Sequence, residues 1–131
     1  MLVVDTSAVL AALVGRRQAA ELVEHLAQDG DLHAPHLIDT EVLHTLRRLT
    51  ITAEISEDRA TDALGDFAEL ALVRYPHQPL SGRVWELRHN LTAYDATFVA
   101  LAEALGAPLV TCDARLASAP AHRAVVALFE H

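Results

Sequence analysis

The chain has no lysine and only one cysteine, and each of these facts excludes a class of protein or of binding site. All ten basic residues are arginines. Receiver domains and haloacid-dehalogenase-type phosphatases combine an acidic pocket with a lysine, so they are excluded. One thiol, Cys112, allows neither an internal disulfide nor a thiolate metal site. Strand alternation turns Cys112 away from its neighbours, so we expect an inert core thiol.

Aromatic residues and long apolar runs are also scarce. Aromatics make up 5% of the 131 residues, whereas hydrophobic residues make up 52%. We therefore expect a large core of Ala, Leu and Val. No apolar run approaches the roughly 20 residues that span a bilayer, and no basic segment precedes the short apolar start as in a signal peptide. A single domain over residues 1–131, with no membrane contact and a cytoplasmic location, is expected.

Positive charge is scarce, since 10 basic residues stand against 18 acidic ones and the net charge is −8. Phosphate binding normally depends on clustered cations, so an acidic chain is a poor non-specific binder of nucleic acid. A metal ion and a few arginines would have to attract such a ligand, and the candidates are Arg16, Arg47, Arg83, Arg88 and Arg115. The same negative charge suits a basic protein partner.

Short apolar runs alternate with helical patterns along the chain. Strands are expected at 2–4, 32–34, 72–75, 109–112 and 124–129, and helices at 8–13, 17–28, 37–49, 57–70, 79–91 and 93–105. Thr6 and Ser7 offer capping hydroxyls for the first helix. Strands joined by helical crossovers form a parallel sheet that is covered on both faces. The pattern thus predicts an α/β fold, a three-layer α/β/α sandwich with a central, mostly parallel sheet.

Four acidic residues lie beside apolar sequence where one element gives way to another. Asp5 and Asp113 each follow a strand, Glu41 lies beside the apolar stripe of a helix, and Asp95 lies in the segment that opens a long helix. Ligands in such folds bind beyond the carboxyl ends of the strands, where Asp5 and Asp113 point. Four converging carboxylates repel one another without a cation. Oxygen ligands favour a hard ion, so we expect Mg²⁺, with Mn²⁺ as the alternative.

Each acid also has an ordinary structural explanation. Asp5 and Asp113 could cap the helices that follow them, and Asp95 occupies the third position of a capping box. Glu41 could be a solvated residue at a helix edge. The interpretation as a site rests on the shared placement of the four acids.

Two hydroxyls and one histidine accompany the acids. Thr111 lies on the same side of its strand as Asp113, although ordinary strand propensity explains it nearly as well. Ser7 could bond Asp5 or simply cap the helix. His44 follows Glu41 at the Glu-x-x-His spacing of di-iron bundles, but no second copy exists, so we expect a surface or partly buried histidine.

With these motifs the chain resembles PIN-domain ribonucleases, specifically the VapC-type toxins of bacterial toxin–antitoxin pairs. The resemblance covers essentially the whole chain and rests on segments 4–8, 91–96 and 109–116 and on Glu41. It implies a PIN-like sandwich and metal-dependent hydrolysis of an RNA phosphodiester by a metal-activated water. It also implies inhibition by a VapB-like antitoxin and homodimerisation.

The resemblance also implies roles for individual residues. The catalytic and metal-binding acids are Asp5, Glu41, Asp95 and Asp113, and the supporting hydroxyls are Ser7 and Thr111. Glu41 is expected to orient or deprotonate the attacking water. Arg115 stands where some relatives carry a further acid, so we expect one tightly held ion and a second recruited by the RNA phosphate. A non-catalytic module that binds RNA or an antitoxin, and a DNA-directed nuclease, are the alternatives.

Overall fold

Five parallel strands form one sheet at the centre of the part of the chain that the structure describes. This computed structural model describes residues 1–15 and 19–130. The strand order is β3-β2-β1-β4-β5, and every pairing is parallel. The strands are β1 (Leu2–Val4), β2 (Leu32–Pro35), β3 (Leu72–Tyr75), β4 (Leu109–Thr111) and β5 (Val126–Leu128).

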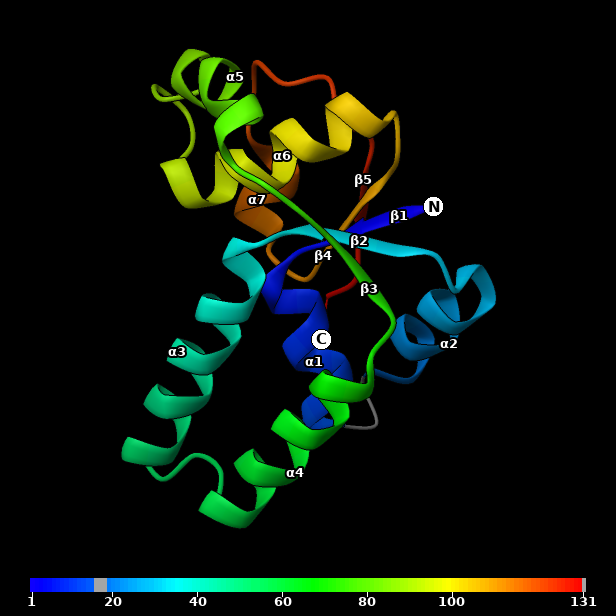
Figure 1. Cartoon of the computed structure of the whole chain (residues 1–131), viewed down its shortest axis with the longest axis vertical. Coiled ribbons are helices and arrows are strands. Elements are labelled where there is room, and N and C mark those ends of the chain that lie inside the picture. The colour runs from blue at the N-terminus through cyan, green and yellow to red at the C-terminus, as the bar shows by residue number, and fades with distance from the viewer. Residues whose placement is uncertain (16–18, 131) are drawn as a thin grey trace.

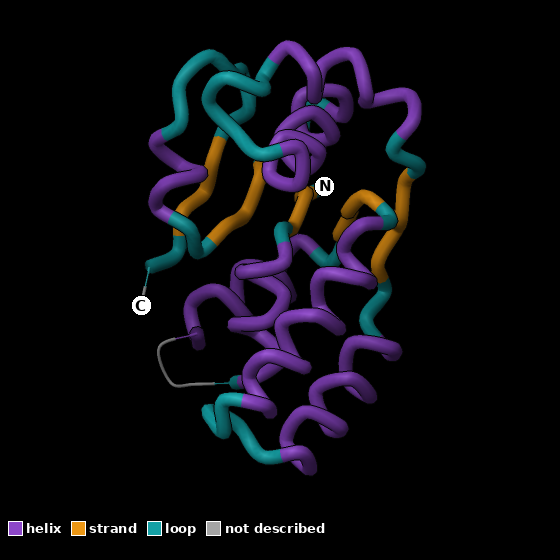
Figure 2. Tube along the Cα trace, turned by 90° about the vertical axis from the view of Figure 1, so that its left-hand side faces the viewer, coloured by secondary structure: helices purple, strands orange, loops and turns teal. Residues whose placement is uncertain are grey.

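Helices cover both faces of the sheet (Figure 1). On one side lie α1 (Thr6–Val14), α2 (Ala20–Asp29), α3 (Leu37–Ile51) and α4 (Glu57–Glu69). On the other side lie the short 3₁₀ helix η2 (Gln78–Leu80), α5 (Ser81–Glu86) and α6 (Ala93–Leu105), and a last helix, α7 (Ala114–Ser118), follows β4. Figure 2 shows the strands between these two groups of helices, which confirms the three-layer α/β/α sandwich.

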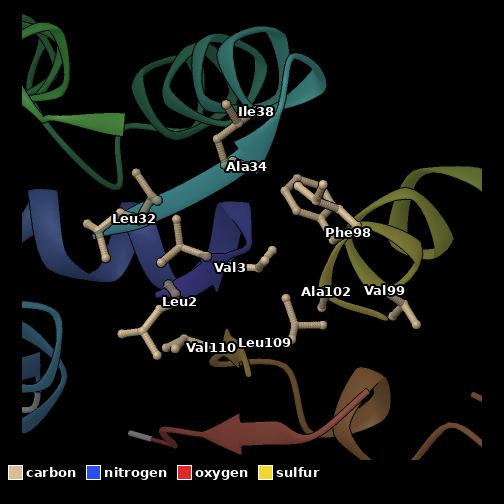
Figure 3. Close-up of a cluster of buried hydrophobic side chains, with 14 of the residues drawn as sticks. Leu2, Val3, Leu32, Ala34, Ile38, Phe98, Val99, Ala102, Leu109 and Val110 are labelled. Atoms are coloured by element: carbon tan, nitrogen blue, oxygen red, sulfur yellow. The ribbon is translucent and has the colours of Figure 1, made fainter. Parts of the chain in front are cut away.

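The core lies between the sheet and its covering helices. Val3, Leu109 and Val110 are fully buried in the central strands, and Phe98 of α6 packs toward them (Figure 3). The buried cluster consists mainly of Ala, Leu and Val, as the composition predicts. Each fully buried Leu, Val or Phe side chain stabilises the fold by about 1.5–3 kcal/mol. The positions at the strand ends are thus held by a rigid base.

The chain reverses its direction across the sheet beside β1. It passes from β1 to β2 and β3 on one side and then returns to β4 on the other side of β1. A crevice for ligands forms at such a switch point, beyond the carboxyl ends of the two neighbouring strands. β1 and β4 therefore deliver the residues that follow them to one place. Within the described residues, no helix has the length and apolar character needed to cross a membrane.

The start of α1 and the end of α5 differ from the positions expected from the sequence. α1 starts at Thr6 rather than at residue 8, because Asp5 caps it and its carboxylate accepts a hydrogen bond from the Ala8 amide at 2.9 Å. Of the capping residues that the sequence offers, Asp5 is thus the one used, and not Thr6 or Ser7. α5 ends at Glu86 rather than at residue 91, because His89 and Asn90 are weak helix formers and only turns follow. The expected helix start at Arg17, and the candidate Arg16, lie outside the described residues.

Candidate active site

All four predicted acids line one pocket at the carboxyl ends of β1 and β4. Its volume is about 290 Å³. Asp5 follows β1 and Asp113 follows β4, while Glu41 comes from α3 and Asp95 from the first turn of α6. A larger hollow of about 400 Å³ between α1, α2 and α4 is lined by apolar side chains and one acid, Asp66, so it offers no comparable set of oxygen ligands.

Asp5 is the most enclosed of the acids, with 6% of its surface exposed. Its Oδ1 accepts hydrogen bonds from the Ser7 hydroxyl at 2.7 Å and from the Ala8 amide at 2.9 Å. Its Oδ2 accepts a hydrogen bond from the Thr111 hydroxyl. A carboxylate has about four lone-pair sites. One site on Oδ2 is thus left for a ligand, and both predicted supporting hydroxyls contact Asp5.

The two hydroxyls are in turn oriented by the backbone after β4. Ser7 Oγ accepts a hydrogen bond from the Cys112 amide at 2.9 Å, and Thr111 Oγ1 accepts one from the Asp113 amide at 3.0 Å. These bonds leave the hydroxyl protons free to point at Asp5. Because the Cys112 amide bonds a side chain instead of the sheet, β4 ends at Thr111, one residue earlier than expected.

Cys112 does not line the acid pocket but a neighbouring hollow that includes Leu10 and Leu49. It is half-buried, which corrects the expectation of a core thiol, because the strand has already ended. Burial, together with the negative charge of Asp5, raises the pKa of the Cys112 thiol to about 11. The thiol is therefore neutral and unreactive at neutral pH, as the sequence predicts.

Burial and repulsion between like charges raise the pKa values of two carboxyl groups in the pocket, those of Asp5 and Asp95. Burial raises the pKa of Asp5 and the charge of Asp95 adds to this shift, although hydrogen bonds from Thr111, Ser7 and Ala8 oppose it. Burial likewise raises the pKa of Asp95, with a further contribution from the charge of Asp113.

The Thr92 hydroxyl and the positive charge of Arg115 act in the opposite direction on the pKa of Asp95. The three aspartates thus form a chain of like charges, and a bound cation relieves such repulsion.

Glu41 is held by a residue that the sequence analysis did not select. The Thr6 hydroxyl donates a hydrogen bond of 2.6 Å to Glu41 Oε1. The helix that carries Glu41, α3, is held at its N-terminus by His77, whose Nε2 accepts a hydrogen bond from the Leu37 amide at 2.8 Å. The position of Thr6 immediately after Asp5, at the same strand end, is the only sequence signal for its role.

The structural explanations of the aspartates hold as well. Asp113 caps α7 by accepting a hydrogen bond from the Arg115 amide at 2.9 Å, and Arg115 Nε lies 3.7 Å from the same carboxylate. Thr92 caps α6 and accepts a hydrogen bond from the Asp95 amide at 3.2 Å. Capping and pocket lining are compatible, since both place the acid at the start of a helix.

Other polar side chains reach the pocket from α3. His44, Thr45 and Arg48 line it together with the acids, and His44 is exposed, as expected. Arg48 was not among the candidates for phosphate binding, although it follows Glu41 by seven residues and so shares its helical face.

Two of the arginine candidates are engaged away from the pocket. Arg83 donates hydrogen bonds to Glu103 and Glu86, and Arg88 lies over the Trp85 ring. Neither arginine lines the acid pocket. Their positions in α5 and just after it place them in the layer opposite α3.

The donor set fits a hard cation by its chemistry, although the side chains are not gathered around one point. Within the described part of the chain, no three His, Cys, Asp or Glu side chains are arranged to hold a metal ion as they stand. Mg²⁺ commonly keeps several waters and is bound by one or two carboxylates. The pocket therefore meets the requirements of a largely hydrated ion without a preformed cage.

Comparison with known proteins agrees with the fold and the pocket. Residues 2–121 match the PIN domain family, and the chain belongs to this family. It is 50% identical over 119 residues to ribonuclease VapC1 of Mycobacterium tuberculosis, an alignment that covers 90% of both chains. It is 47% identical over 116 residues to VapC ribonuclease Mb0985 of Mycobacterium bovis, with 88% of both chains covered. Its place within the family is therefore among the VapC-type proteins.

A solved structure supports the same fold. VapBC2 from Rickettsia felis, bound to a DNA fragment from their promoter, superposes with a TM-score of 0.72 and covers 98% of both chains. The sequence identity is 13%, so this likeness concerns the fold alone.

Proposed function

We propose that the protein is a metal-dependent endoribonuclease and the toxin of a VapBC-type toxin–antitoxin pair. The observation that carries this proposal is the convergence of Asp5, Glu41, Asp95 and Asp113 on one pocket. Sequence identity of 50% to a VapC ribonuclease supports RNA as the substrate.

The three aspartates bind the ion, directly or through water. Asp5 has one lone-pair site of Oδ2 free for this task, and Ser7 and Thr111 keep its carboxylate in place. A bound Mg²⁺ or Mn²⁺ supplies Lewis-acid chemistry by lowering the pKa of a water and neutralising charge on the phosphate. The three aspartates come from separate elements and would hold a largely hydrated ion, without a preformed cage.

Glu41 orients the attacking water and accepts its proton. Thr6 binds Oε1, so Oε2 is the oxygen available to the water. A general base in such a position typically increases the reaction rate by a factor of about 10²–10⁴. The water oxygen bonds to phosphorus while the bond from phosphorus to the leaving oxygen breaks. The leaving oxygen takes a proton from solvent, and the proton on Glu41 passes back to solvent.

Two protein partners belong to the same proposal. The net charge of −8 suits a basic antitoxin, and the structurally similar VapBC2 of Rickettsia felis carries the name of such a pair. Homodimerisation follows from the resemblance to VapC toxins. Two experiments test these assemblies. Co-expression with a small basic protein encoded next to this gene tests the antitoxin complex, and sedimentation analysis of the protein alone and of the co-expressed complex tests the homodimer.

The activity is tested by incubating the purified protein with total bacterial RNA in three separate conditions, which contain Mg²⁺, Mn²⁺ or EDTA. We expect cleavage with the divalent ions and none with EDTA. RNA binding without cleavage under every condition would support the non-catalytic module instead. Cleavage of single-stranded DNA but not of RNA would support the DNA-directed nuclease.

A further inference from the structure

One face of α3 continues the acid pocket beyond Glu41. His44, Thr45 and Arg48 line the pocket with the four acids and lie on the same side of the helix as Glu41. Arg48 is exposed and carries a permanent positive charge. It stands at the rim of a pocket in which carboxylates otherwise dominate.

Arg48 differs from most other arginines in the described part of the chain, because no salt bridge or hydrogen bond engages its guanidinium there. The engaged arginines bind groups of the protein itself: Arg59 the Val14 carbonyl, Arg74 Asp39, Arg83 Glu103, Arg88 the Trp85 carbonyl and Arg115 Asp113. Arg47 precedes Arg48 and is equally exposed, but it lines a separate hollow between α3 and α4. Arg48 therefore combines an available guanidinium with a place at the acids.

We propose that Arg48 is a positioning residue that binds a backbone phosphate of the RNA beside the phosphate that is cleaved. This inference rests on the nuclease function proposed above. A rise of 1.5 Å per residue places Arg48 about 10 Å beyond Glu41 along α3. On this offset we assign its guanidinium to a phosphate next to the one at the acids.

The charge balance of the pocket explains why such a residue is needed. Four carboxylates repel a polyanion, and the chain has few basic residues with which to attract one. Arginine binds phosphate through two parallel hydrogen bonds, which fix its orientation as well as its distance. A fixed cation at the rim thus offsets repulsion and sets the register of the strand.

Equilibrium binding of a short, mixed-sequence, single-stranded RNA in EDTA, where cleavage does not occur, measures this contact. Arg48→Gln should weaken binding roughly tenfold, whereas the matched control Arg47→Gln should bind like the wild type. The plot of log affinity against log salt should lose about 0.7 from its slope in Arg48→Gln. Arg48→Lys should recover part of the affinity, because it keeps the charge but loses the paired hydrogen bonds.

Cleavage of total bacterial RNA separates positioning from chemistry. For Arg48→Gln we expect the rate at limiting RNA to fall roughly tenfold, with the rate at saturating RNA unchanged, so that KM rises and kcat does not. Equal behaviour of Arg48→Gln and Arg47→Gln would overturn the inference, as would a fall in kcat at constant KM. If the wild type cleaves no RNA but binding still depends on Arg48, the nuclease proposal fails and the phosphate contact stands.

Discussion

Thr6 and Glu41 are joined by a hydrogen bond of 2.6 Å between the threonine hydroxyl and Oε1 of the glutamate, across 35 positions of the sequence. The bond links the first residue of α1 to α3. A free glutamate side chain has considerable rotamer freedom. Thr6 removes much of that freedom and fixes the proposed base at the edge of the pocket.

Replacing Thr6 by valine should therefore slow RNA cleavage about tenfold, because Glu41 loses its orientation but keeps its carboxylate. The free energy of unfolding should fall by about 1 kcal/mol or less. Thr6→Ser retains the hydroxyl and serves as the control. Equal rates for the valine and serine variants would show that this bond has no part in catalysis.

Replacing Asp95 by asparagine should reduce cleavage more than about 100-fold, since even residues that only support metal ligands contribute 10–100-fold. The same variant should be at least as stable as the wild type in EDTA at neutral pH. Its carboxylate is disfavoured by burial and by Asp113, and the amide removes that charge. Urea unfolding measures the stability, and a clear loss would mean that Asp95 has a structural role that the pocket does not explain.

The stability of the metal-free protein should decrease as the pH rises above the ordinary aspartate value of 3.8. The pKa values of Asp5 and Asp95 are raised in the folded state, so the folded protein binds more protons than the unfolded chain in this window. The penalty is complete once the pH exceeds the raised pKa values. Excess Mg²⁺ should weaken this dependence, because the cation compensates the same charges.

Unfolding free energies in EDTA from about pH 4 to about pH 8 check this dependence. Asp95→Asn should flatten the curve, whereas Asp62→Asn, an equal change of charge at an exposed position of α4, should leave its shape unchanged. A curve for Asp95→Asn that is as steep as that of the wild type would contradict the assignment.

Replacing Arg83 by alanine should destabilise the fold by about 2 kcal/mol, because the enclosed Glu103 carboxylate loses its charged partner and, among the described residues, keeps only the hydrogen bond from the Arg123 amide. Arg83 donates to both Glu103 oxygens, at 2.7 and 3.1 Å, and also to the Ala121 carbonyl, so it ties α5, α6 and the following loop together. Arg88→Ala, which removes only an exposed contact with Trp85, should change stability by less than about 0.5 kcal/mol. Similar losses for both variants in thermal unfolding would contradict this expectation.

Asp5 and Asp113 could be placed from the sequence because the carboxyl ends of neighbouring parallel strands share an edge. Short apolar runs separated by helical patterns predicted such a sheet, and β1 and β4 are neighbours in it. Thr111 could be placed as well, since strand alternation puts it on the same side as Asp113. The case for Asp95 and Glu41 from placement alone was weaker, because a helix-opening acid and a helix-edge acid each have simpler explanations, and the resemblance strengthened it.

Contacts between elements that are distant in sequence could not be predicted. The Thr6–Glu41 bond and the capping of α3 by His77 each join two elements, and no local pattern encodes which elements meet. Arg48 carried a signal, its seven-residue spacing from Glu41, but the helix face that meets the pocket is decided by packing. The sequence left the cap of α1 open because Asp5, Thr6 and Ser7 are all good capping residues, and only their geometry distinguishes them.

β1 is synthesised long before β4, yet the two strands pair directly. Asp5 leaves the ribosome about a hundred residues before Thr111 and Asp113, which complete its surroundings. A nascent chain or an early truncation product thus carries separated acids that cannot act together. Any activity that needs these acids together therefore becomes available only after the chain has been made through Asp113 and β1 has paired with β4.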